Sequence, residues 1–205
     1  MIAIIDYGVG NLFSLLCSLK FIGQDAVITD DPASIEKCGK ILLPGVGAFG
    51  DAIKKLRGAG LAEPVIREAK RGKPLLGVCL GMQLLFEKSH EFGEHEGLGL
   101  LRGVVAPISS AIPAGLKIPH IGWNALKFPD GGKSHLFKYI NEGDHVYFVH
   151  SFHAEQCADS IIATTDYGAD LTAAVADGNV FGTQFHPEKS GNAGLNILRA
   201  FAEMS

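Results

Sequence analysis

Short runs of apolar residues alternate with longer segments of helical spacing over the first half of the chain. The apolar runs predict strands at Ile2–Tyr7, Ala26–Thr29, Lys40–Leu43 and Pro74–Val78. The segments of helical spacing are Asn11–Ile22, Asp51–Arg57, Leu61–Arg71 and Leu80–Lys88. Because the strand runs are apolar instead of alternating with polar residues, both faces of the sheet need a cover. We therefore expect an α/β fold, with a mostly parallel central sheet flanked by helices.

The pattern changes after about residue 103, where short β-rich segments are separated by glycine, proline, aspartate and asparagine. These segments are Gly103–Ile108, Trp123–Phe128, His145–Phe152, Ile161–Thr165, Thr172–Ala176 and Val180–Gln184. Between the last two, Asp177-Gly178-Asn179 is typical of a hairpin turn. We expect an antiparallel β extension of the sheet, and then a closing amphipathic helix at Gly191–Glu203.

Composition and charge restrict the class of protein. Of 205 residues, 47% are hydrophobic, 20% are charged and 26 are glycine, which excludes a disordered chain and a coiled coil. The sequence contains no repeat, low-complexity tract or linker, so we expect a single domain over residues 1–205. The net charge of −4 creates no positive field for phosphate backbones, so we expect no nucleic-acid partner.

The beginning of the chain does not have the pattern of a signal peptide. Residues Met1–Asp6 lack a basic region, and their apolar run stops at Asp6. Uncharged stretches such as Pro74–Phe86 contain Gly and Gln and are shorter than the ~18 apolar residues of a membrane helix. We expect a cytoplasmic protein without a membrane partner.

The cysteines predict neither a metal site nor disulfides. They are widely spaced, without a C-x-x-C pair or a neighbouring histidine cluster, at Cys17, Cys38, Cys79 and Cys157. We expect free thiols in a reducing compartment, no bound metal and no cofactor.

Cys79 has an unusual local sequence. It stands in Gly77-Val78-Cys79-Leu80-Gly81, between a predicted strand and a predicted helix, with a glycine two residues away on each side. This is the cysteine form of a nucleophile elbow, a sharp turn that lifts the side chain out of the sheet. The glycines remove Cβ atoms that would clash in such a turn. The start of the following helix favours a thiolate. A buried structural cysteine is the alternative.

A base and its orienting carboxylate follow the last predicted strand. His186 and Glu188 are two residues apart, so on an extended chain they project to the same face. Glu188 can then bind one imidazole nitrogen while the other faces the thiol. We expect a Cys79, His186, Glu188 triad, although another of the eight histidines is an alternative base.

A glycine-rich loop leaves the strand Lys40–Leu43. Its sequence is Leu43-Pro44-Gly45-Val46-Gly47-Ala48-Phe49-Gly50. We predict that backbone N–H groups of Gly45, Val46 and Gly47, completed by the N–H of Leu80, form an oxyanion hole. A simple tight turn is the alternative, whereas a phosphate-binding loop would end in Lys-Ser/Thr.

These motifs resemble the class I (triad) glutamine amidotransferases, and among them the glutaminase subunits of imidazole glycerol phosphate synthase. The resemblance runs from Asp6 to the final helix. Its motifs are Asp6–Asn11, Leu43–Phe49, Gly77–Gln83, His120–Asn124, Tyr147–Ser151 and Gln184–Ser190.

The resemblance implies that Cys79 attacks the side-chain amide of L-glutamine. Ammonia would leave, and water would hydrolyse the γ-glutamyl thioester to glutamate. His186 would transfer the protons, and Glu188 would orient His186. By the same resemblance, Gln83, Ser151 and Phe152 bind the substrate. Relatives often have Tyr at the position of Phe152, so this chain lacks a side-chain hydroxyl there.

The resemblance also implies a partner. It is a cyclase subunit of (β/α)8 barrel fold, HisF, which forms a heterodimer with this chain. The cyclase would use the ammonia to convert PRFAR to imidazole glycerol phosphate and AICAR in histidine biosynthesis. Asn11, Trp123 and Lys189 would lie at that interface, near the ammonia passage. If the Gly45–Val46 peptide must turn its N–H toward the oxyanion, the isolated subunit hydrolyses glutamine poorly.

Three other hypotheses remain open. The chain could be the glutaminase of another class I amidotransferase, such as anthranilate or aminodeoxychorismate synthase, although Met82 and Gly122–Asn124 disfavour this. It could be a cysteine peptidase or chaperone of related α/β architecture, which the Glu188 spacing disfavours. It could be an inactive scaffold, although all three triad residues are present.

Overall fold

The computed structural model describes residues 1–129 and 132–204. Its central sheet has seven strands in the order β11-β12-β13-β4-β3-β1-β2. In chain order these are β1 (Ile2–Ile5), β2 (Ala26–Thr29), β3 (Lys40–Leu43), β4 (Leu75–Val78), β11 (Ile161–Asp166), β12 (Asp170–Asp177) and β13 (Val180–Thr183). All neighbours from β13 to β2 pair in parallel, whereas β12 and β11 add on as antiparallel strands. The expected α/β fold is confirmed.

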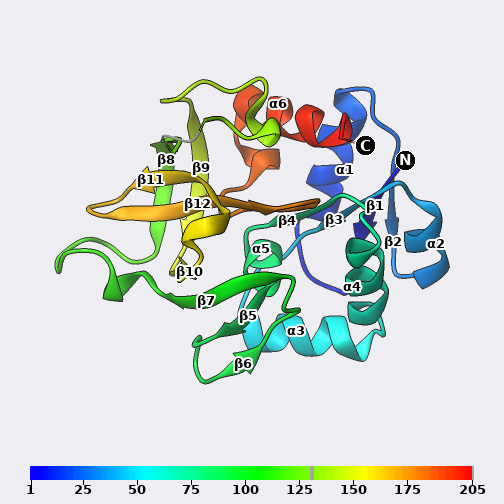
Figure 1. Ribbon diagram of the computed structural model, residues 1–205, viewed down its shortest axis with the longest axis horizontal. Helices are drawn as coiled ribbons and strands as arrows, with labels where there is room; N and C mark the ends of the chain where they lie inside the picture. Colours follow the sequence, from blue (N-terminus) through cyan, green and yellow to red (C-terminus); the bar gives the residue numbers. More distant parts are fainter. Residues whose placement is uncertain (130–131, 205) are drawn as a thin grey trace.

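Helices cover both faces of this sheet (Figure 1). They are α1 (Leu12–Phe21), α2 (Pro32–Lys37), α3 (Phe49–Gly58), α4 (Ala62–Lys70), α5 (Leu80–Leu84) and α6 (Gly191–Ala202). Because successive strand residues point to opposite faces, Ile2 and Ile4 pack with α1 and α6 while Ala3 and Ile5 pack with α2 to α5. The apolar strand runs therefore fill two cores, one on each face.

The predicted hairpin is confirmed. Strands β12 and β13 are antiparallel, with Asp177 opposite Val180 and only Gly178 and Asn179 between them. Gly178 has a φ of 56°, a conformation that glycine adopts without steric cost. The turn returns the chain to the centre of the sheet beside β4, and so places the end of β13 next to Cys79.

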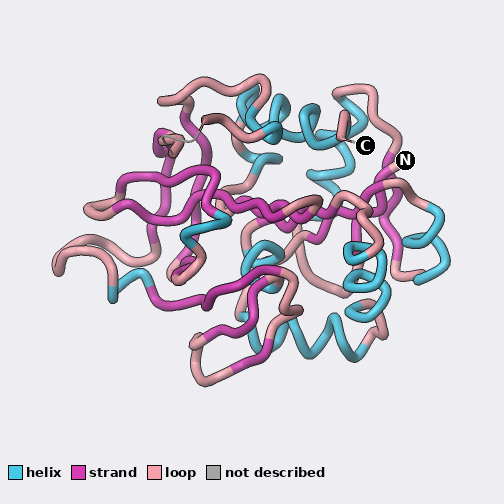
Figure 2. Tube along the Cα trace, viewed as in Figure 1, coloured by secondary structure: helices cyan, strands magenta, loops and turns pink. Residues whose placement is uncertain are grey.

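The antiparallel extension is only part of the remaining β structure, because two smaller sheets pair separately from the central one; the strands of all three are magenta in Figure 2. One has the order β10-β7-β5-β6 and the other pairs β8 with β9. Their strands are β5 (Phe86–Ser89), β6 (His95–Glu96), β7 (Leu101–Pro107), β8 (His120–Ala125), β9 (His145–His150) and β10 (Phe152–Glu155). Short 3-10 helices occur at η1 (Ile108–Ser110), η2 (His135–Phe137), η3 (Ala158–Ser160) and η4 (Pro187–Lys189).

Several predicted bounds differ from the structure, and two predicted elements continue across a break in it. The helix expected at Leu80–Lys88 ends at Leu84, because the chain then enters β5, which pairs with β6 and β7. The strand expected at His145–Phe152 breaks at Ser151, where β9 ends and β10 begins in another sheet. In both cases strand pairing with distant segments overrides the local pattern.

Helix α2 was missed, although it carries a sequence signal. The side chain of Asp31 accepts hydrogen bonds from the N–H groups of Ala33 and Ser34, and Pro32 occupies the first turn. An aspartate cap followed by proline is typical of a helix start. No helix in the described ranges is long and apolar enough to cross a membrane.

Candidate active site

Cys79 is the single residue between β4 and α5, and its backbone is strained. Its φ is 55° and its ψ is −112°, a left-handed region that residues other than glycine rarely occupy. The Cys79 N–H donates to the Thr183 carbonyl at 2.7 Å, which ties the turn to the end of β13. The structure therefore has the sharp strand-to-helix turn that the sequence predicts.

The glycines around this turn are required by close backbone contacts. A Cβ on Gly77 would lie 2.7 Å from the Gly81 carbonyl oxygen, and a Cβ on Gly45 would lie 2.6 Å from the Gly81 nitrogen. A Cβ on Gly81 itself would overlap the Leu43 carbonyl oxygen. The elbow and the glycine-rich loop thus pack backbone to backbone, which no larger residue permits.

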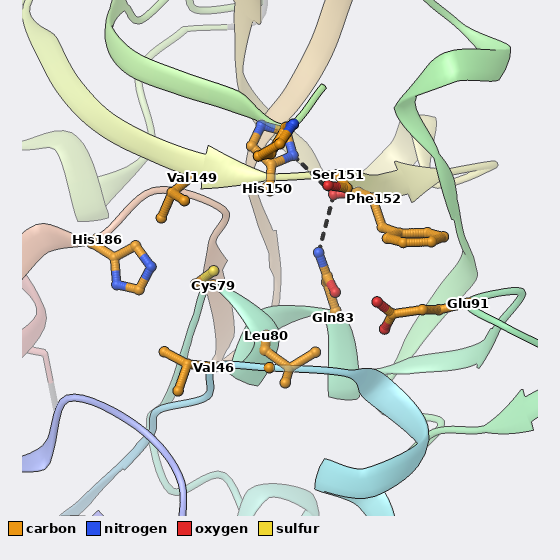
Figure 3. Close-up of a pocket in the computed structure, with 12 residues that line it drawn as sticks. Val46, Cys79, Leu80, Gln83, Glu91, Val149, His150, Ser151, Phe152 and His186 are labelled. Carbon is orange, nitrogen blue, oxygen red and sulfur yellow. Dashed lines mark hydrogen bonds between the residues drawn. The ribbon is translucent and has the colours of Figure 1, made fainter. Parts of the chain in front are cut away.

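His186 and Glu188 lie beside the elbow, at the end of the strand that neighbours β4. The Nδ1 of His186 is 2.8 Å from Oε1 of Glu188, and the two side chains are 3% and 0% exposed. Figure 3 shows the His186 ring beside the Cys79 sulfur. The side-chain Nδ2–H of Asn11, in the turn before α1, donates to the same Glu188 oxygen at 2.9 Å. The three residues of the predicted triad therefore meet.

Charge and hydrogen bonding set the protonation of this group. Burial lowers the pKa of His186, but hydrogen bonds and charge from Cys79 and Glu188 outweigh it, so the pKa is raised overall. For Glu188, burial raises the pKa, and the bond to His186 reverses this and holds it below its ordinary value. The arrangement therefore favours a charged imidazolium on His186 paired with the Glu188 carboxylate.

A pair of glutamines supports the nucleophile from the side. The Nε2 of Gln83 donates to Oε1 of Gln184 at 2.9 Å and to the Phe152 carbonyl at 3.1 Å. The Nε2 of Gln184 lies 3.7 Å from the Cys79 sulfur. We call Gln83 and Gln184 the glutamine pair. Gln184 was not among the predicted site residues, although its place at the end of the predicted strand, just before Phe185-His186, was a signal.

A cavity of about 300 Å³ opens over Cys79 (Figure 3). The residues predicted to form the oxyanion hole or bind substrate that line it are Val46, Gly47, Leu80, Gln83, Ser151 and Phe152. Gly45 lies behind the wall, against the elbow, and does not line it. The helix α5, the end of β9 and the loop after β3 thus converge on one pocket.

Glu91 also lines this cavity, although it was not among the predicted site residues. It lies in the acidic stretch Glu91–Glu96, yet Glu91 is only 8% exposed. Its Oε2 accepts a hydrogen bond from the Phe49 N–H at 2.5 Å, which fixes the carboxylate at the start of α3. Burial raises its pKa, and the bond from Phe49 and the charge of His95 oppose this. No local pattern distinguishes Glu91 from its exposed neighbours.

Tyr7 anchors the glycine-rich loop from below. Its hydroxyl donates to the Pro44 carbonyl at 2.7 Å, and the ring is buried. Burial, and then the negative charge of Cys79, raise the pKa of Tyr7, so the hydroxyl keeps its proton and remains a donor. This contact fixes the peptide that leads into Gly45 and Val46.

The residues predicted for a partner interface gather at one edge of the site. Trp123 is 52% exposed and meets the Tyr147 ring edge-on, with ring centroids 6.0 Å apart. The ammonium of Lys189 lies 5.9 Å from the centre of the same ring. The Tyr147 carbonyl also accepts a hydrogen bond from the backbone N–H of His186. The Asn11 side chain contacts Glu188. All three residues are therefore within one or two contacts of the triad.

Comparisons with known proteins give the family. The model of glutamine amidotransferase class-I matches residues 3–204. The chain is 50% identical to "Imidazole glycerol phosphate synthase subunit HisH" of Sulfurimonas denitrificans, over 99% of this chain and 98% of the relative. It is 49% identical to the protein of the same name from Caldanaerobacter subterraneus subsp. tengcongensis, over 100% and 98% of the two chains.

Solved structures agree on the fold. A structure described as "Crystal structure of glutamine amidotransferase" superposes with a TM-score of 0.74 at 20% identity, covering 97% of this chain and 98% of the other. PurLQS from Thermotoga maritima gives 0.72 at 22% identity, covering 98% and 96%. The chain therefore belongs to the class I glutamine amidotransferases and, within them, to the HisH subunits of imidazole glycerol phosphate synthase.

Proposed function

We propose that the chain is a single-domain glutaminase that releases ammonia from L-glutamine through Cys79, His186 and Glu188. The observation that carries this proposal is the strained elbow at Cys79 with the His186–Glu188 pair beside it, at the base of an open cavity. Relatives of the same name that are 49% and 50% identical over nearly their whole length support it. The cytoplasmic location stays a prediction.

The chemistry follows from the protonation that the site favours. The thiolate of Cys79 attacks the δ-carbon of glutamine, and His186 gives its proton to the departing nitrogen, which leaves as ammonia. A water molecule then attacks the thioester while His186 takes one of its protons. The C–S bond breaks and glutamate leaves. Cys79 is again a thiolate beside a protonated His186. Glu188 holds the ring in place throughout.

The negative charge that develops on the substrate oxygen needs donors. The N–H of Leu80 follows the nucleophile directly, and Val46 and Gly47 face the cavity from the opposite loop. Gly45 takes part by letting the loop approach the elbow, since it lies behind the wall. A turn of the Gly45–Val46 peptide would bring a second N–H toward the oxyanion.

The rest of the cavity fits an amino acid. The carboxylate of Glu91 is held facing the cavity and is suited to the α-ammonium group of glutamine. Ser151 and the backbone of Phe152 face it from the other side. Because Phe152 has no hydroxyl, we assign its contact with substrate to the backbone alone.

We further propose that the ammonia passes to a partner subunit, the cyclase HisF, in a heterodimer. The names of the relatives imply a partner subunit. The contact residues that we assign to this partner are the exposed Trp123, Lys189 near the Tyr147 ring that Trp123 also meets, and Asn11, which contacts Glu188. Their closeness to the triad gives the partner a route to control glutamine hydrolysis.

The test is release of ammonia and glutamate from L-glutamine, measured for the chain alone and with a cyclase barrel carrying its nucleotide ligand. We expect little turnover alone and a large rise with the loaded partner. Cys79→Ala should bind the barrel, lose glutamine-dependent synthesis and keep synthesis from added ammonium salt, whereas Cys17→Ala, at an exposed thiol, should keep both. Absence of ammonia release by the loaded complex would contradict the proposal.

A further inference from the structure

A series of hydrogen bonds outside the triad leads from strand β8 to the wall of the pocket. The Nε2 of His120 lies 2.9 Å from Oδ1 of Asn124, and its Nδ1 lies 3.0 Å from Nε2 of His150. The Nδ1 of His150 then lies 2.8 Å from the Phe152 carbonyl (Figure 3). That carbonyl also accepts from the glutamine pair, which reaches the Cys79 sulfur.

The rings of this series are held rigidly. His120 and His150 are directly opposite each other in the β8–β9 pairing. The His120 ring is fully buried and stacks on Phe148 on one side, at 5.0 Å, and on Tyr167, at 4.1 Å. Two stacking partners prevent the ring from rotating, so its nitrogens face fixed directions.

The positions of the protons on His150 follow from its partners. A carbonyl only accepts, so the Nδ1 of His150 carries a proton toward Phe152. Burial, and then the charges of His120, His153 and His186, lower the pKa of His150 to about 3, although its bond to Phe152 opposes this. The ring is therefore neutral, its Nε2 is bare, and the proton between the rings belongs to Nδ1 of His120.

The contact between His120 and Asn124, at the other end of the series, must then have its donor on Asn124. Burial also lowers the pKa of His120, although its bond to Asn124 opposes this, so this ring is neutral. With its one proton on Nδ1, its Nε2 is bare. A bare Nε2 needs an N–H from Asn124, which a half-turn of the side-chain amide supplies. The half-turn breaks the hydrogen bond from Asn124 Nδ2 to the Asp166 carbonyl. This bond is exposed, so solvent can satisfy the carbonyl instead. A buried positive charge is the costlier alternative.

We propose that His150 is a positioning residue of the glutamine pocket, held as its Nδ1–H tautomer by His120 so that it fixes the Phe152 carbonyl. The proposal rests on the function proposed above. The fixed carbonyl orients the amide of Gln83 and keeps the backbone of Ser151 and Phe152 turned toward the substrate. Loss of this donor would weaken glutamine binding more than it slows the chemical step.

Two substitutions separate the nitrogens of His150. Asparagine places an N–H near the Nδ1 position, whereas glutamine reaches the Nε2 position and leaves the Phe152 carbonyl without its donor. In the full complex with the cyclase, we expect KM for glutamine to rise about tenfold in His150→Gln and about twofold in His150→Asn, with a smaller change in kcat. His145→Gln, at an exposed histidine of the same strand, should leave KM unchanged.

A second pair of variants tests the same donor from its other side. His120→Asn keeps an N–H toward His150 and should resemble His150→Asn, whereas His120→Leu removes it and should raise KM as His150→Gln does. This pair keeps the proposal testable where His150→Gln does not fold. Equal effects of the asparagine and glutamine variants on KM would show a packing role only and overturn the proposal.

The tautomer is measured independently of activity. In the full chain labelled with ¹⁵N-histidine, we expect His150 to show a protonated Nδ1 and a bare Nε2 at neutral pH. A protonated Nε2 would overturn the proposal whatever the kinetics. A chain with the expected tautomer whose loaded complex releases no ammonia would instead contradict the proposed function alone.

Discussion

Asn11 and Glu188, which are 177 positions apart, are joined by a hydrogen bond of 2.9 Å on the same carboxylate oxygen that meets the His186 ring. The resemblance to relatives assigned Asn11 to the partner interface. The structure also makes it a direct neighbour of the triad, at the start of α1. A partner that shifts α1 would therefore act on the orientation of Glu188.

Asn11→Ala should lower kcat for glutamine hydrolysis in the loaded complex by about tenfold, with little change in KM. The reason is that Glu188 loses a donor that fixes it, and a hydrogen bond to a charged group contributes roughly 1.5–3 kcal/mol. Steady-state ammonia release measures this effect. Ser14→Ala, at an exposed position of α1, is the matched control. An unchanged kcat in Asn11→Ala would show that Glu188 does not need this donor.

Tyr7→Phe tests the support of the glycine-rich loop. Removal of the hydroxyl frees the Pro44 carbonyl and loosens the peptides of Gly45 and Val46. We expect kcat with the loaded partner to fall about threefold to tenfold, because the oxyanion donors are less well positioned. Substitution of Gly45 itself is unsuitable, because its side chain would meet the elbow. Equal turnover by Tyr7→Phe and the unchanged protein would contradict the role of this bond.

Gly81→Ala should destabilise the fold by about 3 kcal/mol or more, because its methyl group would overlap the Leu43 carbonyl. Urea unfolding followed by circular dichroism measures the free energy of unfolding. Gly58→Ala is the matched control, because its Cβ would meet open space in α3. It should be neutral or stabilise by up to about 1 kcal/mol. Similar losses in both variants would show that the close backbone contact at Gly81 is not the cause.

Much of the central sheet and the triad could be predicted from the sequence, because both depend on local signals. The apolar runs of β1, β2, β3 and β4 are continuous, and Gly-x-Cys-x-Gly needs its glycines for reasons that any backbone imposes. His186 and Glu188 are two residues apart, so a single strand end presents both.

What could not be predicted depends on long-range packing. Phe86–Ser89 continues the helical pattern of Leu80–Leu84 but becomes a strand because β7 is available to pair with it. Glu91 resembles its exposed acidic neighbours and is buried because the start of α3 lies against it. His120 and His150 are 30 positions apart and meet only because β8 and β9 pair in one register.

The low pKa of His150 predicts a change in the pH dependence of stability. Its folded pKa of about 3 lies below the unfolded value near 6.5, so above pH 6.5 both states are neutral and the ring carries no penalty. Below that pH the unfolded chain takes up a proton that the folded chain refuses. Stability is therefore lost as the pH falls from about 6.5 toward 3, by up to about 1.4 kcal/mol per pH unit.

His150→Asn removes this titration without removing the donor toward Phe152. The free energy of unfolding, measured in urea between pH 7 and pH 4.5, should fall less steeply with decreasing pH in the variant than in the unchanged protein. The difference in slope should approach one bound proton below about pH 6. The exposed His145→Asn should keep the original slope, because this side chain lies at the surface and outside the series of buried rings. Parallel curves for His150→Asn and the unchanged protein would mean that His150 takes up its proton in the folded chain, and that the ring is not held neutral between His120 and Phe152.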